Sequence, residues 1–437
     1  MKAPYLGLSS SRTRNLTVGL ESFPSDTSGP VPGDDLETPL YTGRYFLIFE
    51  KDTKDFSAAA SVLNTTLNTK VASSSDFQND TFSEEKIADA DAFIYEELGV
   101  ALVSAEQHQV QAIQQQVAGG LARIEPEMVV YAIPFEATEA LPQGIAAFVA
   151  AAAPSATWGI SATGSDLTTF TGQNVRVAIL DTGLDLTHPD FAGRVTAAGQ
   201  SSFVPGIASV QDLHGHGTHC TGIACGNSDP TGVRYGVAGK SDIYIGKVLD
   251  NTGRGAQSWI LNGISWAAAN QCKVISMSLG SRVFPGLAFV TAYERAIASA
   301  VAKGSLVVVA AGNDSSRSTG VINPVGSPGN CPSAIAVTAV DIGLKIADFA
   351  NGSINPGQDV FIGGPGVNVL SSWPMPTRYR SISGTSMATP FVAGISALIC
   401  EMNPGFTPAQ VKGELSKLAQ SLPLPLSDIG CGLVKAP

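Results

Sequence analysis

Short apolar runs dominate the chain from about Trp158 onward, and they alternate with stretches of helical length and Gly-rich turns. The runs of strand length are Val175–Leu180, Ile243–Val248, Lys273–Met277, Ser305–Ala310 and Ala334–Val340. Their lack of polar alternation is typical of parallel strands that helices cover on both faces. The helical stretches are Gly217–Cys225, Ser258–Ala269, Thr291–Lys303, Thr385–Met402 and Pro408–Ala419. Residues 157–437 are therefore predicted to form a three-layer α/β domain with a parallel sheet, and its sites should lie beyond the carboxyl ends of the strands.

The N-terminal third has a different pattern. Strands are predicted at Arg44–Glu50, Phe93–Leu102 and Met128–Ile133, with helices at Phe56–Leu67 and Ala105–Leu121. This order predicts a small α+β module over residues 43–133. Residues 1–42 are rich in Ser, Thr, Pro and Gly and are predicted to be a flexible tail, whereas residues 134–156 break the pattern and are predicted to be a linker.

Charge separates the same two parts of the chain. Residues 1–150 hold 9 Lys+Arg against 21 Asp+Glu, whereas residues 151–437 hold 17 against 16. A nearly neutral body offers no electrostatic footprint for nucleic acid or an anionic membrane, so neither is expected as a partner. We find no apolar run of membrane-spanning length and no secretory signal pattern after Met1. The compartment stays open between the cytoplasm and export by another route.

Six cysteines are spread widely, and no two form a CxxC pair. Zinc ligation by cysteine is therefore not expected. Disulfide bonding is left open, because an even number of cysteines in a chain of 437 residues is weak evidence for it.

Three segments carry residues whose side chains could take part in catalysis. Asp181 ends an apolar run and precedes Thr-Gly, His216 begins His-Gly-Thr-His at a predicted helix start, and Ser386 lies in Gly-Thr-Ser-Met-Ala-Thr-Pro at another helix start. Unpaired backbone N–H groups at such a start can stabilise negative charge. Each residue alone has an ordinary structural explanation, as a turn residue, a surface or metal-binding histidine, or a helix cap.

Acyl transfer needs this combination of residue types. A serine hydroxyl is a weak nucleophile until a base takes its proton, and imidazole titrates in the required range. A buried carboxylate on the far ring nitrogen holds the tautomer and stabilises the imidazolium. Asn313, in Ala-Ala-Gly-Asn after another apolar run, is a candidate donor to the oxyanion, and the backbone N–H of Ser386 is the second.

The segments DTG, HGTH, MSLG, AAGN and GTSMATP, in this order, resemble the signature blocks of the subtilase family, and the resemblance covers roughly residues 156–437. It implies a subtilisin-like serine endopeptidase that acts on protein or peptide substrates. Asp181, His216 and Ser386 match the catalytic triad, and Asn313 matches the oxyanion amide. Ser278, Leu279 and Gly280 resemble the strand that binds the substrate backbone, and Gly326 resembles the floor of the specificity pocket. With no charged residue in those stretches, we expect apolar or aromatic residues before the scissile bond.

The other histidines are interpreted as structural. His219 is expected to be a helix residue and His214 a loop residue, while His188 lies in a segment that resembles a structural stretch of the family. Asp190, in that same segment, is a candidate calcium ligand, although the sequence identifies no further ligands. No cofactor is required for the chemistry.

Two positions depart from the usual subtilase pattern. Cys220, directly after HGTH, resembles the thiol-bearing branch of the family and should pack beneath the base, which implies sensitivity to mercurials. Phe391 stands where the family usually has histidine, so packing near Ser386 is expected to differ.

The N-terminal module also resembles a family element. Residues 43–133, from GRYFLIFE to IEPEMVVYAI, resemble the inhibitory and chaperone-like prodomain of subtilases. The resemblance implies a zymogen with its own prodomain as intramolecular inhibitor, cleaved autocatalytically within residues 132–157. Three alternatives remain: a processing protease with one substrate, an inhibited non-catalytic binding protein, and a metal hydrolase that uses His214, His216 and His219.

Overall fold

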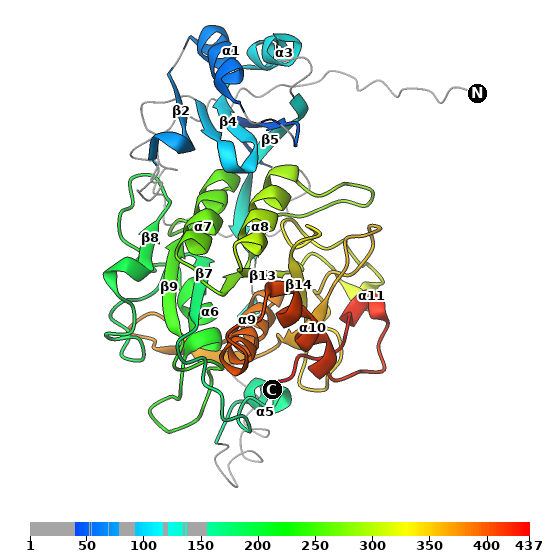
Figure 1. Cartoon of the computed structure of the whole chain (residues 1–437). Coiled ribbons are helices and arrows are strands. Elements are labelled where there is room, and N and C mark those ends of the chain that lie inside the picture. Colours follow the sequence, from blue (N-terminus) through cyan, green and yellow to red (C-terminus); the bar gives the residue numbers. More distant parts are fainter. Residues whose placement is uncertain are drawn as a thin grey trace, which may run out of the picture.

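The computed structural model describes residues 40–51, 53, 55–68, 70–77, 92–116, 121–133, 136–137 and 155–437. Nearly all of the predicted tail and most of the predicted linker lie outside these residues. In Figure 1 the N-terminal elements lie at the top, above the helices α7 and α8 and the large sheet.

A seven-stranded sheet forms the centre of the C-terminal part, in the order β15-β14-β13-β11-β7-β9-β8. All its strand pairs are parallel, as predicted. The strands are β7 (Arg176–Asp181), β8 (Gln200–Ser202), β9 (Asp242–Lys247), β11 (Val274–Met277), β13 (Leu306–Ala310), β14 (Ile335–Val340) and β15 (Ile362–Pro365).

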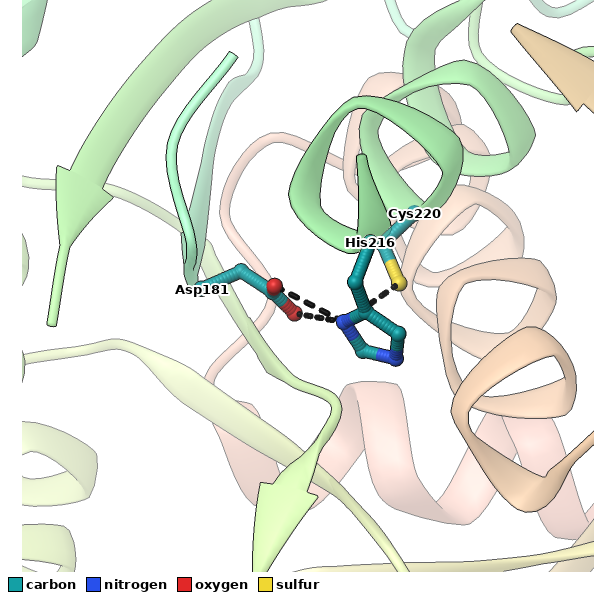
Figure 2. Close-up of side chains that lie close together, drawn as sticks. All are labelled: Asp181, His216 and Cys220. Atoms are coloured by element: carbon teal, nitrogen blue, oxygen red, sulfur yellow. Dashed lines mark hydrogen bonds and ion pairs between the residues drawn. The ribbon is translucent and has the colours of Figure 1, made fainter. Parts of the chain in front are cut away.

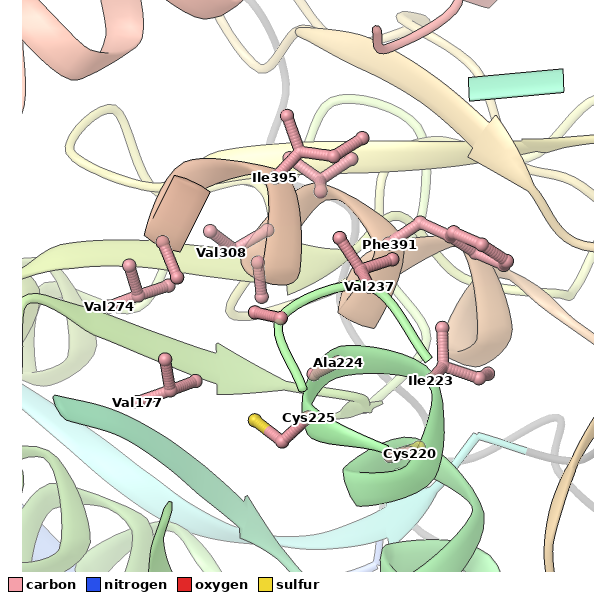
Figure 3. Packing of buried hydrophobic residues seen from close by; sticks show 14 of the residues in the cluster. Val177, Cys220, Ile223, Ala224, Cys225, Val237, Val274, Val308, Phe391 and Ile395 are labelled. Atoms are coloured by element: carbon pink, nitrogen blue, oxygen red, sulfur yellow. The ribbon is translucent and has the colours of Figure 1, made fainter. Parts of the chain in front are cut away.

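Helices cover both faces of this sheet, so the predicted three layers are confirmed. Val177 and Ile179 of β7 point into one core with α6 (His216–Cys225) and α9 (Thr385–Met402), while Ala178 and Leu180 point into the other with α7 (Gln257–Ala269) and α8 (Thr291–Ala302). Figure 3 shows the first of these cores, in which Phe391 and Ile395 of α9 belong to the same cluster as Val177 and Val308 of the sheet. The helices α5 (Trp158–Thr163), α10 (Pro408–Leu418) and α11 (Leu426–Ile429) complete this part.

Helix α9 is long and apolar enough to span a membrane by composition, but 89% of its apolar window is buried inside the protein. It contacts β11, β13, β14 and β15 as the central helix of the core. Its apolar character is therefore explained by burial against the sheet.

The N-terminal sheet has the order β5-β1-β4-β3-β2. Its strands are β1 (Tyr41–Phe49), β2 (Val71–Ser73), β3 (Ala92–Tyr95), β4 (Val100–Ser104) and β5 (Leu121–Ala132), with helices α1 (Ser57–Leu67) and α3 (Gln107–Gln116). The single strand predicted over Phe93–Leu102 is wrong. Gly99 adopts a left-handed φ of 61°, and the chain reverses there, so β3 and β4 pair antiparallel.

This sheet is sandwiched between two sets of helices. Leu47 and Phe49 face α1 and α3, whereas Phe46 and Ile48 pack into the core that contains α7 and α8. Period-two alternation along β1 therefore serves two different cores. The face of the N-terminal sheet that carries Phe46 and Ile48 is buried by the C-terminal part.

Two edges of the N-terminal segment continue into sheets of the C-terminal part. Strand β5 pairs antiparallel with β10 (Arg254–Ala256) on one side and with β12 (Leu279–Gly280) on the other. Further along, β6 (Glu136–Ala137) pairs with β17 (Tyr379–Ser383), which also pairs with β16 (Val369–Ser372). The N-terminal segment therefore pairs with β12 through β5 and with β17, the strand that leads into α9, through β6.

Candidate active site

Asp181 and His216 form a buried pair at the carboxyl edge of the sheet. Asp181 is the last residue of β7, and His216 is the first residue of α6. Nδ1 of His216 lies 2.8 Å from Oδ1 and 3.0 Å from Oδ2 of Asp181 (Figure 2). Their side chains are 1% and 0% exposed, so water does not screen the interaction.

The pKa of His216 is raised well above its ordinary value. Burial by itself opposes the charged imidazolium, but the negative charge and hydrogen bond of Asp181, together with the neighbouring Cys220, outweigh it. Asp181 therefore favours the protonated ring. This is the electrostatic property that a base needs once it has accepted a proton.

Ser386 is joined to this pair through Cys220 and Ser278. Ser386 is the second residue of α9, and its hydroxyl donates to the Ser278 carbonyl at 3.3 Å. The Ser278 hydroxyl donates in return to the Ser386 carbonyl at 2.8 Å. The Cys220 thiol donates to that same carbonyl at 3.5 Å, and its Sγ lies 3.9 Å from Nδ1 of His216. These contacts bring the elements that carry Asp181, His216 and Ser386 together.

The side chain of Asn313 is oriented by the residue before Ser386. Its Oδ1 accepts from both the backbone N–H (2.9 Å) and the hydroxyl (2.7 Å) of Thr385. Its Nδ2 consequently lies beside Gly384, only 2.9 Å from where a Cβ would stand. A glycine at 384 thus leaves room for an amide donor next to the start of α9.

Thr182 and Asp212, which the sequence reasoning did not assign to the site, connect the Asp181 loop to the His216 helix. The Thr182 N–H donates to Oδ1 of Asp181 at 2.7 Å. The Thr182 hydroxyl donates to Asp212 at 3.0 Å and accepts from the Gly217 N–H at 2.9 Å. The only available signal was a carboxylate four residues before His216, close to the predicted start of the helix.

Asp212 is 1% exposed, yet it remains an acceptor for several donors. Its oxygens accept from the N–H groups of His214, Gly215 and Thr218, each at 2.9 Å, and from the Thr218 hydroxyl at 2.7 Å. Burial opposes its charge, but these donors and the Lys247 ammonium keep the pKa of Asp212 below its ordinary value. Asp212 is therefore a charged cap for the helix that begins at His216.

Lys247 is a fully buried cation near the same loop. Its Nζ donates to the Thr182 carbonyl and, at 3.0 Å, to Asn251. Burial lowers its pKa, while the carboxylates of Asp212, Asp250 and Asp181 act in the opposite direction. Lys247 thus holds the peptide that follows Asp181.

Of the predicted substrate-binding residues, Leu279 and Gly280 lie beside β5. Leu279 pairs with Ala132 and Gly280 with Tyr131. A Cβ at Gly280 would lie 2.8 Å from the Ser327 carbonyl and 3.7 Å from Cδ1 of Ile133, and a Cβ at Gly326 would lie 3.1 Å from the Ser281 carbonyl. A side chain at either glycine would therefore crowd the neighbouring backbone carbonyl.

The three histidines proposed as a metal cluster do not converge. Nε2 of His219 bonds the carbonyls of Val369 (3.1 Å) and Arg380 (3.0 Å), and burial lowers its pKa to about 3. Within the described part of the chain, the His/Cys/Asp/Glu ligand atoms that do meet are those of Asp181, His216 and Cys220, the same atoms that form the hydrogen bonds above. A metal site built from His214, His216 and His219 is therefore not supported.

Asp190 lies in an aromatic cluster. Its carboxylate accepts from the hydroxyls of Tyr235 (2.6 Å) and Tyr379 (2.8 Å), and Arg378 approaches it at 3.5 Å. The Asp190 backbone N–H donates to Nδ1 of His188 at 3.2 Å, and Nε2 of His188 bonds the Arg378 carbonyl at 2.8 Å. These are donors rather than the oxygen ligands that surround Ca²⁺, and a calcium role for Asp190 remains only a prediction.

The structure shows how both residues that depart from the family pattern are packed. Cys220 packs against His216, as expected, and all six cysteines lie in the described part of the chain as free thiols. Phe391 is fully buried, and its ring would lie 2.4 Å from a Cβ at Gly159 of α5. The aromatic ring is therefore accommodated by a glycine on the neighbouring helix.

Comparison with known proteins places this chain in a family. The sequence profile of the subtilase family matches residues 172–432. The chain belongs to the subtilase family. It is 42% identical over 254 residues to "Subtilisin" from Bacillus pumilus, an alignment that covers 58% of this chain and 86% of that protein. The same identity and length hold for "Subtilisin E" from Bacillus subtilis (strain 168), of which 62% is covered.

A solved structure described as a cold adapted subtilisin-like serine proteinase matches with a TM-score of 0.55 and 31% identity. The match covers 65% of this chain and 99% of that one. The predicted fold and the predicted enzyme class, a subtilisin-like serine endopeptidase, are confirmed.

Proposed function

We propose that this subtilase hydrolyses peptide bonds through an acyl-enzyme on Ser386. Oγ of Ser386 attacks the carbonyl carbon of the scissile bond while its proton passes to Nε2 of His216. The resulting oxyanion accepts hydrogen bonds from Nδ2 of Asn313 and the N–H of Ser386. The C–N bond then breaks, and His216 gives its proton to the leaving amine. Water repeats these steps on the ester, releasing the carboxylic acid and restoring the serine hydroxyl.

Asp181 remains a carboxylate throughout this cycle. It holds the Nδ1–H tautomer, which leaves Nε2 as the acceptor, and it stabilises the imidazolium. The observation that carries the proposal is the 2.8 Å contact between Asp181 and Nδ1 of His216, in a buried site that Cys220 connects to Ser386.

The test compares two serines of helix α9. Ser386→Ala and Ser396→Ala both remove a buried hydroxyl, but that of Ser396 only bonds the Val392 carbonyl at 2.7 Å within the helix. Each protein is nicked with trypsin, the trypsin is inhibited, and hydrolysis of an apolar peptide panel is measured. We expect activity in the wild type and Ser396→Ala, and a loss of about a million-fold in kcat in Ser386→Ala. Equal activity in all three proteins would refute the role of Ser386.

We also propose that residues 43–133 are an intramolecular inhibitor of the zymogen, followed by a linker over 134–156 and the peptidase over 157–437. Strand β5 supports this proposal because it fills the space between β10 and β12 as an added strand, with the Ala132 N–H donating to the Gly253 carbonyl at 2.7 Å. Main-chain pairing of this kind binds peptides with little regard to sequence. The same edges would bind a substrate, so β5 and a substrate compete.

Preference before the scissile bond is proposed to be apolar or aromatic. Gly280 and Gly326 keep the neighbouring space open, and Ile133, whose Cδ1 approaches Gly280, is 6% exposed there. The same peptide panel checks this preference, and faster cleavage after Lys or Arg would contradict it.

A further inference from the structure

The register of β5 determines which of its peptide groups meets Ser386. In the antiparallel pairing with β12, Tyr131 lies opposite Gly280 and Ala132 opposite Leu279. If the register is continued by one residue, Ile133, the residue after β5, comes opposite Ser278. The Ser278 carbonyl is the acceptor of the Ser386 hydroxyl, at 3.3 Å. An extension of this register would present the carbonyl of Ile133 to Ser386.

In the sequence, that carbonyl is bonded to the nitrogen of Pro134. A proline nitrogen carries a ring methylene where other residues carry hydrogen. In peptide hydrolysis by a serine and a histidine, the imidazole must deliver a proton to this nitrogen within a crowded tetrahedral intermediate. The extra methylene obstructs that transfer, so an Xaa–Pro bond is a poor substrate in this position.

Contacts far from Ser386 hold the register in place. Glu127, which is fully buried, accepts from the Ser258 N–H (2.8 Å), from Arg44 (2.6 Å) and from Thr42 (2.6 Å). Two residues earlier, Glu125 accepts from the Thr291 and Ala292 N–H groups at 3.0 and 3.2 Å.

These two glutamates cap the N-termini of α7 and α8. A slip of one residue would turn both carboxylates to the wrong face of the sheet. A slip of two would move them by about 7 Å, away from both helices.

We propose that β5 binds its own active site as a resident inhibitor, in a register whose reactive bond, Ile133–Pro134, the enzyme does not hydrolyse. Processing then requires β5 to leave this register, and the first cut falls at another bond. This inference rests on the proposed function, because it assumes that Ser386 is the nucleophile. It concerns the regulation of that site by one residue of the chain itself.

The experiment uses the full chain and follows intact mass with time after purification. Pro134→Ala replaces the obstructed bond by an ordinary peptide bond. We expect it to be cut between residues 133 and 134 at least about tenfold faster than the wild type is cut at any bond. Pro126→Ala is the matched control, because Pro126 is exposed on the same strand opposite Tyr45. It should behave as the wild type does, and Pro134→Ala combined with Ser386→Ala should remain whole.

A wild-type product that ends at Ile133 would overturn the inference. A second outcome would also overturn it: the Pro134→Ala chain stays whole on incubation, yet a sample of the same variant nicked with trypsin hydrolyses peptides through Ser386. This second outcome leaves the proposed function intact. If no preparation hydrolyses any peptide, the proposed function itself fails and the inference fails with it.

Discussion

The sulfur of Cys220 lies 3.9 Å from Nδ1 of His216, one helical turn further along α6. The same thiol donates to the carbonyl of Ser386, so it contacts both the element that carries His216 and the element that carries Ser386. Burial raises the pKa of Cys220, which keeps it a neutral thiol. A bulky atom on this sulfur would displace His216.

Mercuric ions are therefore expected to lower peptidase activity by roughly tenfold or more. Cys220→Ala should be insensitive, since it retains the base but lacks the sulfur. Cys431, the one cysteine that is partly exposed, provides the control. Cys431→Ala should remain sensitive, and loss of inhibition in that variant instead would contradict the assignment.

The acid limb of the pH–rate profile follows from the raised pKa of His216. Because the base must be neutral to accept a proton, activity should rise with pH through a pKa above 6.5. The titration can be followed by NMR of the full-length Ser386→Ala protein. His219, whose pKa is lowered to about 3, should stay neutral and serves as an internal reference.

Asp181→Asn removes the charge that outweighs burial, so the pKa of His216 should then fall below 6.5. A histidine that titrates at the same pH in both proteins would contradict this account of the pair.

Thr182→Val tests the connection between the loop after Asp181 and the helix that begins at His216. The variant keeps the volume but removes the bonds to Asp212 and Gly217, at a cost of about 1–3 kcal/mol. We expect kcat to fall roughly tenfold to a hundredfold with little change in KM, because the substrate-binding strands are untouched. Thr221→Val is the control, since its hydroxyl bonds only the Gly217 carbonyl within α6, at 2.8 Å. An equal loss in both variants would indicate general damage to the helix.

Glu127 and Glu97 offer a matched pair across the interface of the N-terminal module. Glu127→Ala leaves buried donors without an acceptor and should weaken docking by about 3 kcal/mol, a factor of more than a hundred. Glu97 pairs with Lys303 at 2.7 Å, but the two side chains are 61% and 36% exposed. Glu97→Ala should therefore change docking by less than about 1 kcal/mol.

Hydrogen exchange of the β5 amides in the Ser386→Ala background measures this difference. Protection that survives in Glu127→Ala as well as in Glu97→Ala would show that the buried carboxylate does not hold the strand.

Much of the architecture was readable from patterns in the chain. Apolar runs without alternation predicted strands buried on both faces, because such strands have no solvent side. The strand predicted over Phe93–Leu102 failed because periodicity carries no sign of the reversal at Gly99, where a glycine accepts a left-handed φ. Motif order similarly predicted Asp181, His216 and Ser386, since acyl transfer requires these three residue types together.

What the sequence determined by itself is thus the fold class, the family and the chemical groups of the site, because all three depend on local patterns and residue types. The tertiary structure alone decided how those groups are held. Asp212 and Lys247 are ordinary polar residues in the chain, and only folding buries them around Thr182. Tertiary structure likewise decided that β5 lies between β10 and β12, with Ala132 opposite Leu279 and Tyr131 opposite Gly280. Register is a property of paired strands far apart in sequence, and no single segment encodes it. Here Glu127 and Glu125 hold it by capping two helices.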